Sequence, residues 1–395
     1  MCNLEMSYAR FQTLLIVLGL MLLWQTSAAA QAAMAEGNAQ RSRVLPAQSV
    51  DIAPKRSLWT TAKLFQIRDS ELITSQNGPF TLRADIPTGH YFTTPIFSEG
   101  ILFLSAYVET AYFYAIDAVT GKQLVTLQFE KNEISSPAAL GKLVFFGTLK
   151  GKVYAYDLSK RAPVWFYEQK GSSFAYSEPA VDDGVVYFCG SESGLFAFSA
   201  DSGALRWVYK SEKPLYRPAV ATNEVIVLNQ TGPMIAIDKK TGAKKWEAKV
   251  GREFIGPSIL GEHVLVSHVD GEIRAYALQD GALEWKSKKD GGARTPLALF
   301  DGLVIYGEQY GNIVALDAAT GVEKWRFKTK KPCGDPVVAG GTFYATCKDQ
   351  RLYALNAQTG ESKWEFEMKK GYPTPTIANG IVYFLGSDGL LQAMQ

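Results

Sequence analysis

The stretch Ala236-Ile237-Asp238-Lys239-Lys240-Thr241-Gly242-Ala243-Lys244-Lys245-Trp246 decides the fold, because the chain keeps returning to it. Residues 315–325 and 354–364 repeat its Ala, its Thr-Gly pair and its Trp at the same spacing. Weaker copies bring the repeat alanines to eight, spaced 39 to 42 residues apart, at Ala115, Ala155, Ala197, Ala236, Ala275, Ala315, Ala354 and Ala393. A period in this range is the signature of a repeat architecture.

A second marker keeps the same period, in the form of eight prolines: Pro95, Pro137, Pro179, Pro218, Pro257, Pro296, Pro336 and Pro375. Two unrelated residue types share one period eight times, so the repetition is highly specific. Each repeat also holds an alternating apolar segment, such as residues 184–188, and a polar Gly-containing turn, such as residues 191–194. These features predict four short strands per repeat and no helices within the repeats.

Four short antiparallel strands cannot bury both of their faces alone, so neighbouring repeats must stack around a central axis. We therefore predict an all-β fold, an eight-bladed β-propeller of four-stranded antiparallel blades. The eighth repeat stops at Gln395, before a fourth strand. Residues 80–86 have strand character, and we predict that this N-terminal strand pairs beside the C-terminal strand, closes the ring and hides both edges.

The repeated phrase resembles the tryptophan-docking motif of the pyrroloquinoline-quinone-type propeller repeat. The resemblance covers about residues 80–395, and it implies that each Trp ring lies over the Ala-to-Gly stretch of a neighbouring blade. Six of the eight tryptophans occupy the motif position, namely Trp165, Trp207, Trp246, Trp285, Trp325 and Trp364. The other two copies have Val125 and, counting back from Pro95, Ala84. Large aromatic residues confined to one repeat position are interpreted as packing residues.

The first residues have a different composition from the repeats. Arg10 precedes an apolar run from Leu14 to Trp24, which leads into an Ala-x-Ala cleavage pattern, and this combination predicts a secretory signal peptide over residues 1–32. Retention of the segment as an uncleaved anchor is the alternative. Residues 33–79 are predicted to be a flexible leader, and residues 80–395 form the propeller. No lipid-attachment Cys follows the apolar run, so we expect a periplasmic or otherwise exported protein that is soluble after cleavage.

Signals for chemistry are sparse. The three histidines show no metal-ligand spacing, and no motif for a nucleophile, a phosphate-binding loop or haem attachment is present. We therefore expect no catalytic residues, no metal and no cofactor. A net charge of +2 gives no reason to expect nucleic acid or an anionic membrane as a partner. Cys333 and Cys347 flank a hairpin turn at residues 340–341 almost symmetrically, so they are candidates for a disulfide, with two small buried residues as the alternative.

The chain also resembles the BamB family, the periplasmic scaffold subunit of the outer-membrane β-barrel assembly machine, in length, in its eight compact repeats and in its export signal. That resemblance implies an exported, non-enzymatic scaffold whose partners are proteins of the cell envelope, such as an outer-membrane β-barrel assembly subunit. Two alternatives are a ligand-sensing or carbohydrate-binding propeller and a quinone-dependent dehydrogenase. The dehydrogenases of this repeat type carry long insertions that build a calcium and quinone pocket, whereas the period here never exceeds 42 residues.

The connections from each Trp to the next Pro vary in length, whereas the Thr-Gly turn is short and constant. Because connections normally run over the surface, and because interfaces use aromatic residues and Arg as anchors, these connections are the predicted partner-binding surface. The candidates are Phe174, Tyr176, Leu215, Tyr216, Arg217 and Phe254. The alternative is that the aromatic residues pack into the top of the ring as core.

Overall fold

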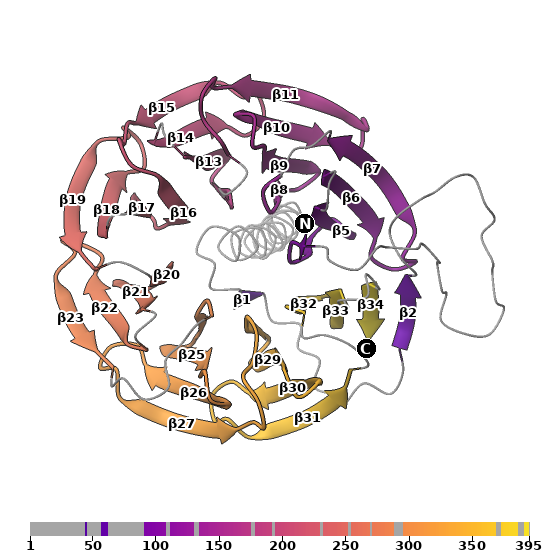
Figure 1. Cartoon of the computed structure of the whole chain (residues 1–395), viewed down its shortest axis with the longest axis vertical. Helices are drawn as coiled ribbons and strands as arrows, with labels where there is room; N and C mark the ends of the chain where they lie inside the picture. Colours follow the sequence, from indigo (N-terminus) through magenta and orange to yellow (C-terminus); the bar gives the residue numbers. More distant parts are fainter. Residues whose placement is uncertain are drawn as a thin grey trace, which may run out of the picture.

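The protein is a ring of eight β-sheets around a central axis (Figure 1). The computed structural model describes residues 44–45, 57–61, 91–107, 111–129, 134–174, 178–191, 194–229, 232–251, 254–268, 271–287, 295–368, 373–385 and 391–394. Neighbouring strands within each blade are antiparallel, and the first seven blades run in chain order from the innermost to the outermost strand. The predicted eight-bladed β-propeller is therefore confirmed.

Each of the first seven blades takes its four strands from one continuous segment. Blade 1 contains β4 (Ile96–Ser98), β5 (Ile101–Tyr107), β6 (Ala111–Asp117) and β7 (Gln123–Phe129), and blade 2 contains β8 (Ala138–Leu140), β9 (Leu143–Gly147), β10 (Lys152–Asp157) and β11 (Ala162–Glu168). Blade 3 contains β12 (Ala180–Asp182), β13 (Val185–Gly190), β14 (Gly194–Ser199) and β15 (Leu205–Tyr209), and blade 4 contains β16 (Leu215–Val220), β17 (Glu224–Asn229), β18 (Pro233–Asp238) and β19 (Lys244–Lys249). Blade 5 contains β20 (Phe254–Leu260), β21 (His263–His268), β22 (Ile273–Ala277) and β23 (Leu283–Lys286). Blade 6 contains β24 (Ala298–Phe300), β25 (Leu303–Gly307), β26 (Asn312–Asp317) and β27 (Glu323–Lys328). Blade 7 contains β28 (Val337–Ala339), β29 (Thr342–Cys347), β30 (Arg351–Asn356) and β31 (Ser362–Glu367).

The Trp of one blade packs on the Thr-Gly turn of the next, as the motif implies. Trp246 of blade 4 donates a hydrogen bond from its indole Nε1 to the carbonyl oxygen of Leu278 in blade 5, at 2.9 Å. A Cβ placed on Gly281 would lie 2.6 Å from Cε3 of the Trp246 ring, closer than side chains approach one another. Gly281 also has a φ of +75°, which disfavours any residue with a Cβ. The last residue of this turn, Gly281 after Asp280 here and the Gly of a Thr-Gly pair in blades 4, 6 and 7, therefore needs to be glycine where a motif Trp lies above it.

The eighth blade takes β32 (Thr376–Ala378), β33 (Ile381–Leu385) and β34 (Leu391–Met394) from the C-terminal end of the ring and its outermost strand, β2 (Ser57–Thr61), from the N-terminal side. The prediction that a strand from the N-terminal side closes the ring is therefore confirmed, but its assignment to residues 80–86 is wrong. Residues 80–86 lie outside the described part of the chain, and the position beside β34 belongs to β2.

The register of β2 against β34 explains why this segment, and not residues 80–86, forms the closing strand. Trp59 pairs with Ala393, just as Trp246 pairs with Ala236 in blade 4. The eighth repeat therefore has its motif Trp, supplied from a segment that the sequence analysis assigned to a flexible leader. Residues 80–86 could offer only Ala84 at this position.

Two further short strands extend the sheets. β3 (Tyr91–Phe92) adds to β5 in blade 1. β1 (Val44–Leu45) runs parallel to β28, on the inner edge of blade 7, and lies inside the ring (Figure 1). The described residues contain no helix of the length and apolarity that a membrane crossing needs.

The core lies between the blades. The junction of blades 3 and 4, for example, is filled by side chains such as Tyr187 and Val227, neither of which is exposed. At the junction of blades 8 and 1, the Tyr383 hydroxyl donates a hydrogen bond to the carbonyl oxygen of Ala118 at 3.1 Å. Burial of this phenol, with a smaller effect of the Asp117 charge, raises the pKa of Tyr383 to about 12. The contact lies at the repeat position that the motif Trp contacts elsewhere, so a buried tyrosine also ties the closing blade to the first.

Candidate protein-binding face

The sequence-predicted partner-binding residues that the structure describes come from the connections at one face of the ring. In a four-stranded antiparallel blade, the connection from the outermost strand to the next blade emerges on the same face as the hairpin between the second and third strands. We call this surface the connector face. The Thr-Gly turns between the third and fourth strands lie on the opposite face. The connector face therefore holds the variable segments of the repeat, whereas the opposite face holds the constant ones.

Two of the six candidates are core residues, so their assignment to a partner-binding surface is wrong. Phe174 has no exposed surface, and its ring lies 5.4 Å from that of Phe196 in an edge-to-face contact. It fits there because Gly147 has no side chain: a Cβ on Gly147 would lie 2.5 Å from Cβ of Phe174. Leu215 is 3% exposed and packs in the cluster between blades 3 and 4. For these two residues the core alternative holds.

Two other candidates are accessible and adjacent. Tyr216 and Arg217 are both half-buried, and Arg217 lies in a bulge of β16, between the paired residues Tyr216 and Ala219. Arg217 has a φ of +48°, which is uncommon for a residue other than glycine. A bulge re-aims the side chains that it carries. Here the guanidinium lies 3.1 Å from a carboxylate oxygen of Glu178, in the preceding connector.

Glu178 was missed by the sequence analysis, although the repeat contains a signal for it. It directly precedes Pro179, just as Arg217 directly precedes Pro218, so the two residues occupy one repeat position in neighbouring blades. The side chains of both residues are 36% exposed, so the pair remains open to solvent and to a partner. The ion pair links two consecutive connectors at the surface.

The structure does not describe the side chains of the last two candidates, Tyr176 and Phe254. Tyr176 lies outside the described residues. Phe254 is described through its backbone, which pairs with His268 at the start of β20. Leu215, three residues before Pro218, pairs in the same way with Asn229, so these candidates share a repeat position that extends the inner strand along its neighbour.

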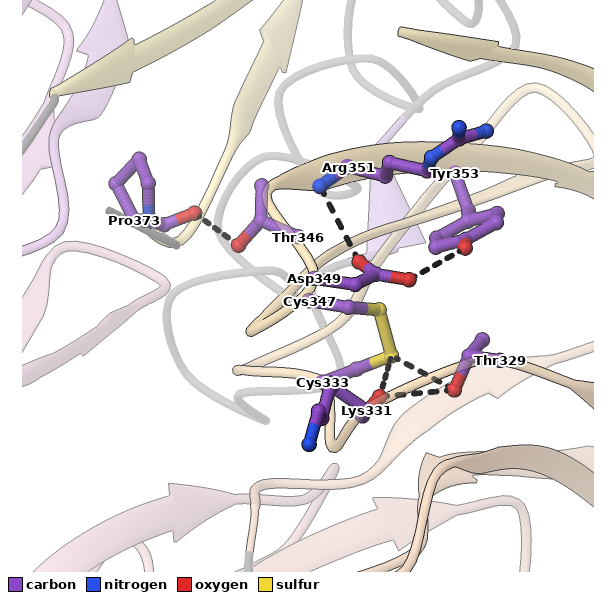
Figure 2. Close-up of a disulfide and its surroundings, with 9 residues drawn as sticks. All are labelled: Thr329, Lys331, Cys333, Thr346, Cys347, Asp349, Arg351, Tyr353 and Pro373. Atoms are coloured by element: carbon purple, nitrogen blue, oxygen red, sulfur yellow. Dashed lines mark hydrogen bonds between the residues drawn. A yellow bond between two sulfur atoms is a disulfide. The ribbon is translucent and has the colours of Figure 1, made fainter. Parts of the chain in front are cut away.

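The two candidate cysteines occupy that same position in blade 7. Cys333 lies three residues before Pro336 and opposite Cys347, the last residue of β29, and a disulfide joins them (Figure 2). The backbone hydrogen bonds fall on the flanking residues, from Gly334 N to Thr346 O and from Lys348 N to Pro332 O. The cysteines therefore form a non-hydrogen-bonded pair, the type in which facing side chains come closest. The bond holds the connector against the hairpin of its own blade.

The hairpin next to this disulfide is fixed by a short polar network (Figure 2). The Tyr353 hydroxyl donates to a carboxylate oxygen of Asp349 at 2.7 Å, and the other oxygen of Asp349 accepts from the Arg351 backbone N at 3.2 Å. Burial, followed by this hydrogen bond and the Asp349 charge, raises the pKa of Tyr353. Tyr353 therefore stays a neutral hydrogen-bond donor at neutral pH.

An open depression hollows the connector face between blades 2 and 3, with a volume of ≈ 610 Å³. Its lining is basic and hydroxylic, with one acidic and one apolar residue: Leu149, Lys150, Glu168, Lys170, Gly171, Ser172, Ser173 and Ser191. None of these residues was singled out from the sequence. Within the described residues, no group of three or more His, Cys, Asp or Glu is arranged to hold a metal ion.

The sequence profile of the family described as "Outer membrane protein assembly factor BamB" matches this chain over residues 48–217, 211–300 and 269–395. Among curated relatives, the outer membrane protein assembly factor BamB of Nitrosomonas eutropha is 28% identical over 120 residues, 30% of this chain and 28% of that protein. That of Yersinia pestis is 32% identical over 135 residues, 30% of this chain and 34% of that protein. The matched segments thus span about a third of each relative's length.

Solved structures share the fold at low identity. BamB from Moraxella catarrhalis covers 78% of this chain and 98% of its own, with a TM-score of 0.57 and 20% identity. The computationally designed Ika8 protein has a TM-score of 0.68 and 15% identity over 77% of this chain and 95% of its own. Quinohemoprotein alcohol dehydrogenase from Comamonas testosteroni has a TM-score of 0.65 and 16% identity over 93% of this chain and 83% of its own. At these identities, the likeness concerns the fold alone.

Proposed function

Because this chain belongs to the family of the outer membrane protein assembly factor BamB, we propose that it is an exported, non-enzymatic scaffold in the assembly of outer-membrane β-barrel proteins. The observation that carries this proposal is the family match, which extends from residue 48 to residue 395 and so includes β2 and all eight blades. Export rests on the predicted signal peptide over residues 1–32, and the mature protein would then work in the periplasm.

The arrangement of the ring supports a protein-binding role. The connector face presents irregular segments on a rigid framework, which is how many binding proteins position their contact residues. On it, the Arg217–Glu178 ion pair and the half-buried Tyr216 form an accessible cluster across the connectors of blades 3 and 4. Among the described non-glycine residues at positive φ, Arg217 is the one that lies within a strand and not in a turn, and strained backbone of this kind occurs at functional sites. We propose this cluster as the contact surface for a barrel-assembly subunit.

Quinone-dependent dehydrogenase activity is the enzymatic alternative, and the repeat lengths argue against it. The repeat alanines are never more than 42 residues apart, so no repeat carries the long insertion that builds a quinone pocket in those enzymes. A fold shared with a dehydrogenase does not carry its chemistry, since function depends on the site built on the fold. A ligand-sensing or carbohydrate-binding propeller would use the same ring without partner proteins, and the following experiment separates it from a scaffold.

The test compares the parent strain with a deletion of the gene and measures the abundance of outer-membrane β-barrel proteins by quantitative proteomics. A scaffold in barrel assembly predicts a broad decrease, restored by the wild-type gene. The double variant Tyr216→Ala with Arg217→Ala should restore it poorly while being present at wild-type level. Lys240→Ala removes a cation from the Thr-Gly turn of the same blade, on the opposite face, and should restore it fully. Unchanged barrel proteins after deletion would contradict the proposal.

A further inference from the structure

The outer strand of blade 2 differs from those of blades 4 to 7 at the two positions beside the motif Trp. In blades 4 to 7 these positions hold charged residues: Lys245 and Glu247, Glu284 and Lys286, Lys324 and Arg326, Lys363 and Glu365. In blade 2 they hold Val164 and Phe166, on β11. Charged residues on an outermost strand discourage pairing with other chains, and β11 lacks them at these two positions, although it carries Pro163 near its start and Glu168 at its end.

The two apolar side chains are open to solvent. Phe166 is 61% exposed and Val164 is 38% exposed. Phe166 lies opposite Tyr154 across the β10–β11 pair, with ring centroids 6.1 Å apart. On the same face, the Lys152 ammonium lies 5.7 Å from the centre of the Phe166 ring. Val164, Phe166, Tyr154 and Lys152 together form a surface that we call the blade 2 rim.

The neighbouring junction differs as well. Blade 1 has Val125 where other blades have the motif Trp, so no indole ring presses on the facing turn of blade 2. That turn carries Arg161 where others carry Gly, at a φ of +51°. Without the ring, a side chain at this position has room. Arg161 in place of Gly adds an exposed positive charge at the start of β11.

The charge of blade 2 is strongly positive. Residues 138–171 contain six basic and two acidic residues, a net charge of +4, whereas the whole chain has a net charge of +2. One of the two acidic residues, Asp157, has its carboxylate 3.6 Å from Lys160 within the blade. At the other end of β11, Lys150 and Lys170 line the depression on the connector face. An acidic partner would therefore meet cations at both ends of the strand.

We propose that the blade 2 rim is a docking edge for an extended, acidic segment of a partner protein, which adds to β11 as a fifth strand. Within the described residues, no strand pairs with the outer edge of β11, so alternate backbone N–H and C=O groups there point outward. Strand addition uses these groups for affinity and the side chains of alternate residues for specificity. Apolar residues of the segment would lie on Val164 and Phe166, and its carboxylates would lie near Lys150, Arg161 and Lys170. This site is separate from the connector cluster of Tyr216 and Arg217.

The test uses a fluorescent peptide in which Glu alternates with Val and Tyr, titrated with the purified protein and followed by anisotropy. We expect saturable binding that weakens as salt is raised, because the attraction between surface charges is screened. The double variant Val164→Thr with Phe166→Thr removes the apolar side chains but keeps residues that favour strands, and blade 1 has Thr126 at the repeat position of Phe166. This variant should bind the peptide about tenfold more weakly or worse. Leu283→Thr, at a 54% exposed apolar position on the outer strand of blade 5, should not weaken it.

Two further probes identify the mode of binding. The same peptide with N-methyl groups on alternate residues cannot donate backbone hydrogen bonds along one edge, so it should bind at least about tenfold more weakly. A peptide with Lys in place of Glu should not bind. Equal binding of the N-methylated peptide, or no binding of the acidic peptide up to about 1 mM, would overturn the proposal. Binding to vesicles of anionic lipid that Val164→Thr with Phe166→Thr abolishes would also overturn it, in favour of a membrane-binding surface.

Discussion

Trp59 lies opposite Ala393 across the antiparallel pair of β2 and β34. The same opposition of Trp and Ala recurs in six other blades, in the pairs Ala155–Trp165, Ala197–Trp207, Ala236–Trp246, Ala275–Trp285, Ala315–Trp325 and Ala354–Trp364. Blade 1, with Ala115 opposite Val125, is the exception. The two ends of the ring therefore meet through the same residue pair that organises the interior repeats.

The closure predicts different effects for two Thr→Pro substitutions. Thr61 pairs with Leu391 in the register in which Ala248 pairs with Met234 in blade 4, a position whose N–H points at the neighbouring strand. Thr61→Pro therefore removes a hydrogen-bond donor between β2 and β34, and it should destabilise the ring by about 3 kcal/mol. Thr81→Pro lies in the segment that was first predicted to close the ring, and it should leave stability unchanged. Urea denaturation of both variants measures the difference. If Thr81→Pro proved the more damaging, the assignment of β2 as the closing strand would be wrong.

The docking of Trp246 on Gly281 predicts a large effect from one added methyl group. Gly281→Ala places a Cβ within 2.6 Å of the indole, at a φ of +75°. Gly261→Ala is the matched control, because its φ is +57° but its Cβ would meet nothing within 4 Å. The control should lose about 1–2 kcal/mol from backbone strain alone, and Gly281→Ala should lose clearly more. Equal losses in chemical denaturation would show that the ring contact contributes nothing.

The disulfide predicts the number of free thiols. After removal of residues 1–32, three cysteines remain, and Cys189 is buried and does not form a disulfide. Denatured, unreduced protein should therefore show one free thiol, whereas three would mean that Cys333 and Cys347 are not joined. Cys333→Ser with Cys347→Ser should destabilise the protein by about 3 kcal/mol, because the bond closes a loop over a sequence separation of 14.

The turn carboxylates predict a pH-dependent contribution to stability. Hydrogen bonds from the Thr320 side chain and from Lys324, together with other contacts that offset a small effect of burial, lower the pKa of Asp317 below its usual value. A carboxyl whose pKa is lowered by folding stabilises the protein above its unfolded pKa and loses that effect as the pH falls through its folded pKa. Asp317→Ala should therefore be destabilising at pH 7 and less destabilising at about pH 3, below the usual pKa of an Asp.

Asp317→Asn is the control for that experiment. Asn356 occupies the same position in blade 7 and accepts hydrogen bonds from the backbone N–H groups of Gln358 and Thr359. Asn at position 317 should thus keep the turn and lose less stability than Ala at pH 7. Urea denaturation at both pH values compares the three proteins. A destabilisation by Ala that is as large at pH 3 as at pH 7 would contradict a role for the ionised carboxylate.

Most of the fold was predictable from the sequence because the same residue types recur at the same positions of successive repeats. A turn that brings a Trp over a Gly leaves a joint signal in the sequence, and five junctions among the described residues repeat it. The closing strand was not predictable in the same way, since β2 and β34 lie at opposite ends of the chain and no fixed spacing connects Trp59 to Ala393. A search for an unassigned Trp upstream of the first repeat would have found it.

The candidate site was predicted less well, because burial in a connector depends on the residue opposite it. Phe174 is indistinguishable from a surface anchor in sequence, yet it is buried against Gly147, which lies in another strand. Arg217 and Glu178 illustrate the converse: their pairing could be inferred once the pre-proline positions of successive blades are aligned. Comparison of one repeat with the others is thus more informative here than residue type alone.

The most direct test of the scaffold role places a photocrosslinking amino acid at position 216 and, in a separate strain, at position 240, in cells that make the protein at its native level. Both positions belong to blade 4, one on the connector face and one on the opposite face. We predict that position 216 crosslinks to a protein of the outer-membrane β-barrel assembly apparatus and that position 240 does not. Crosslinking of the same protein with equal yield from both positions, or of no such protein from position 216, would contradict the role proposed for this face.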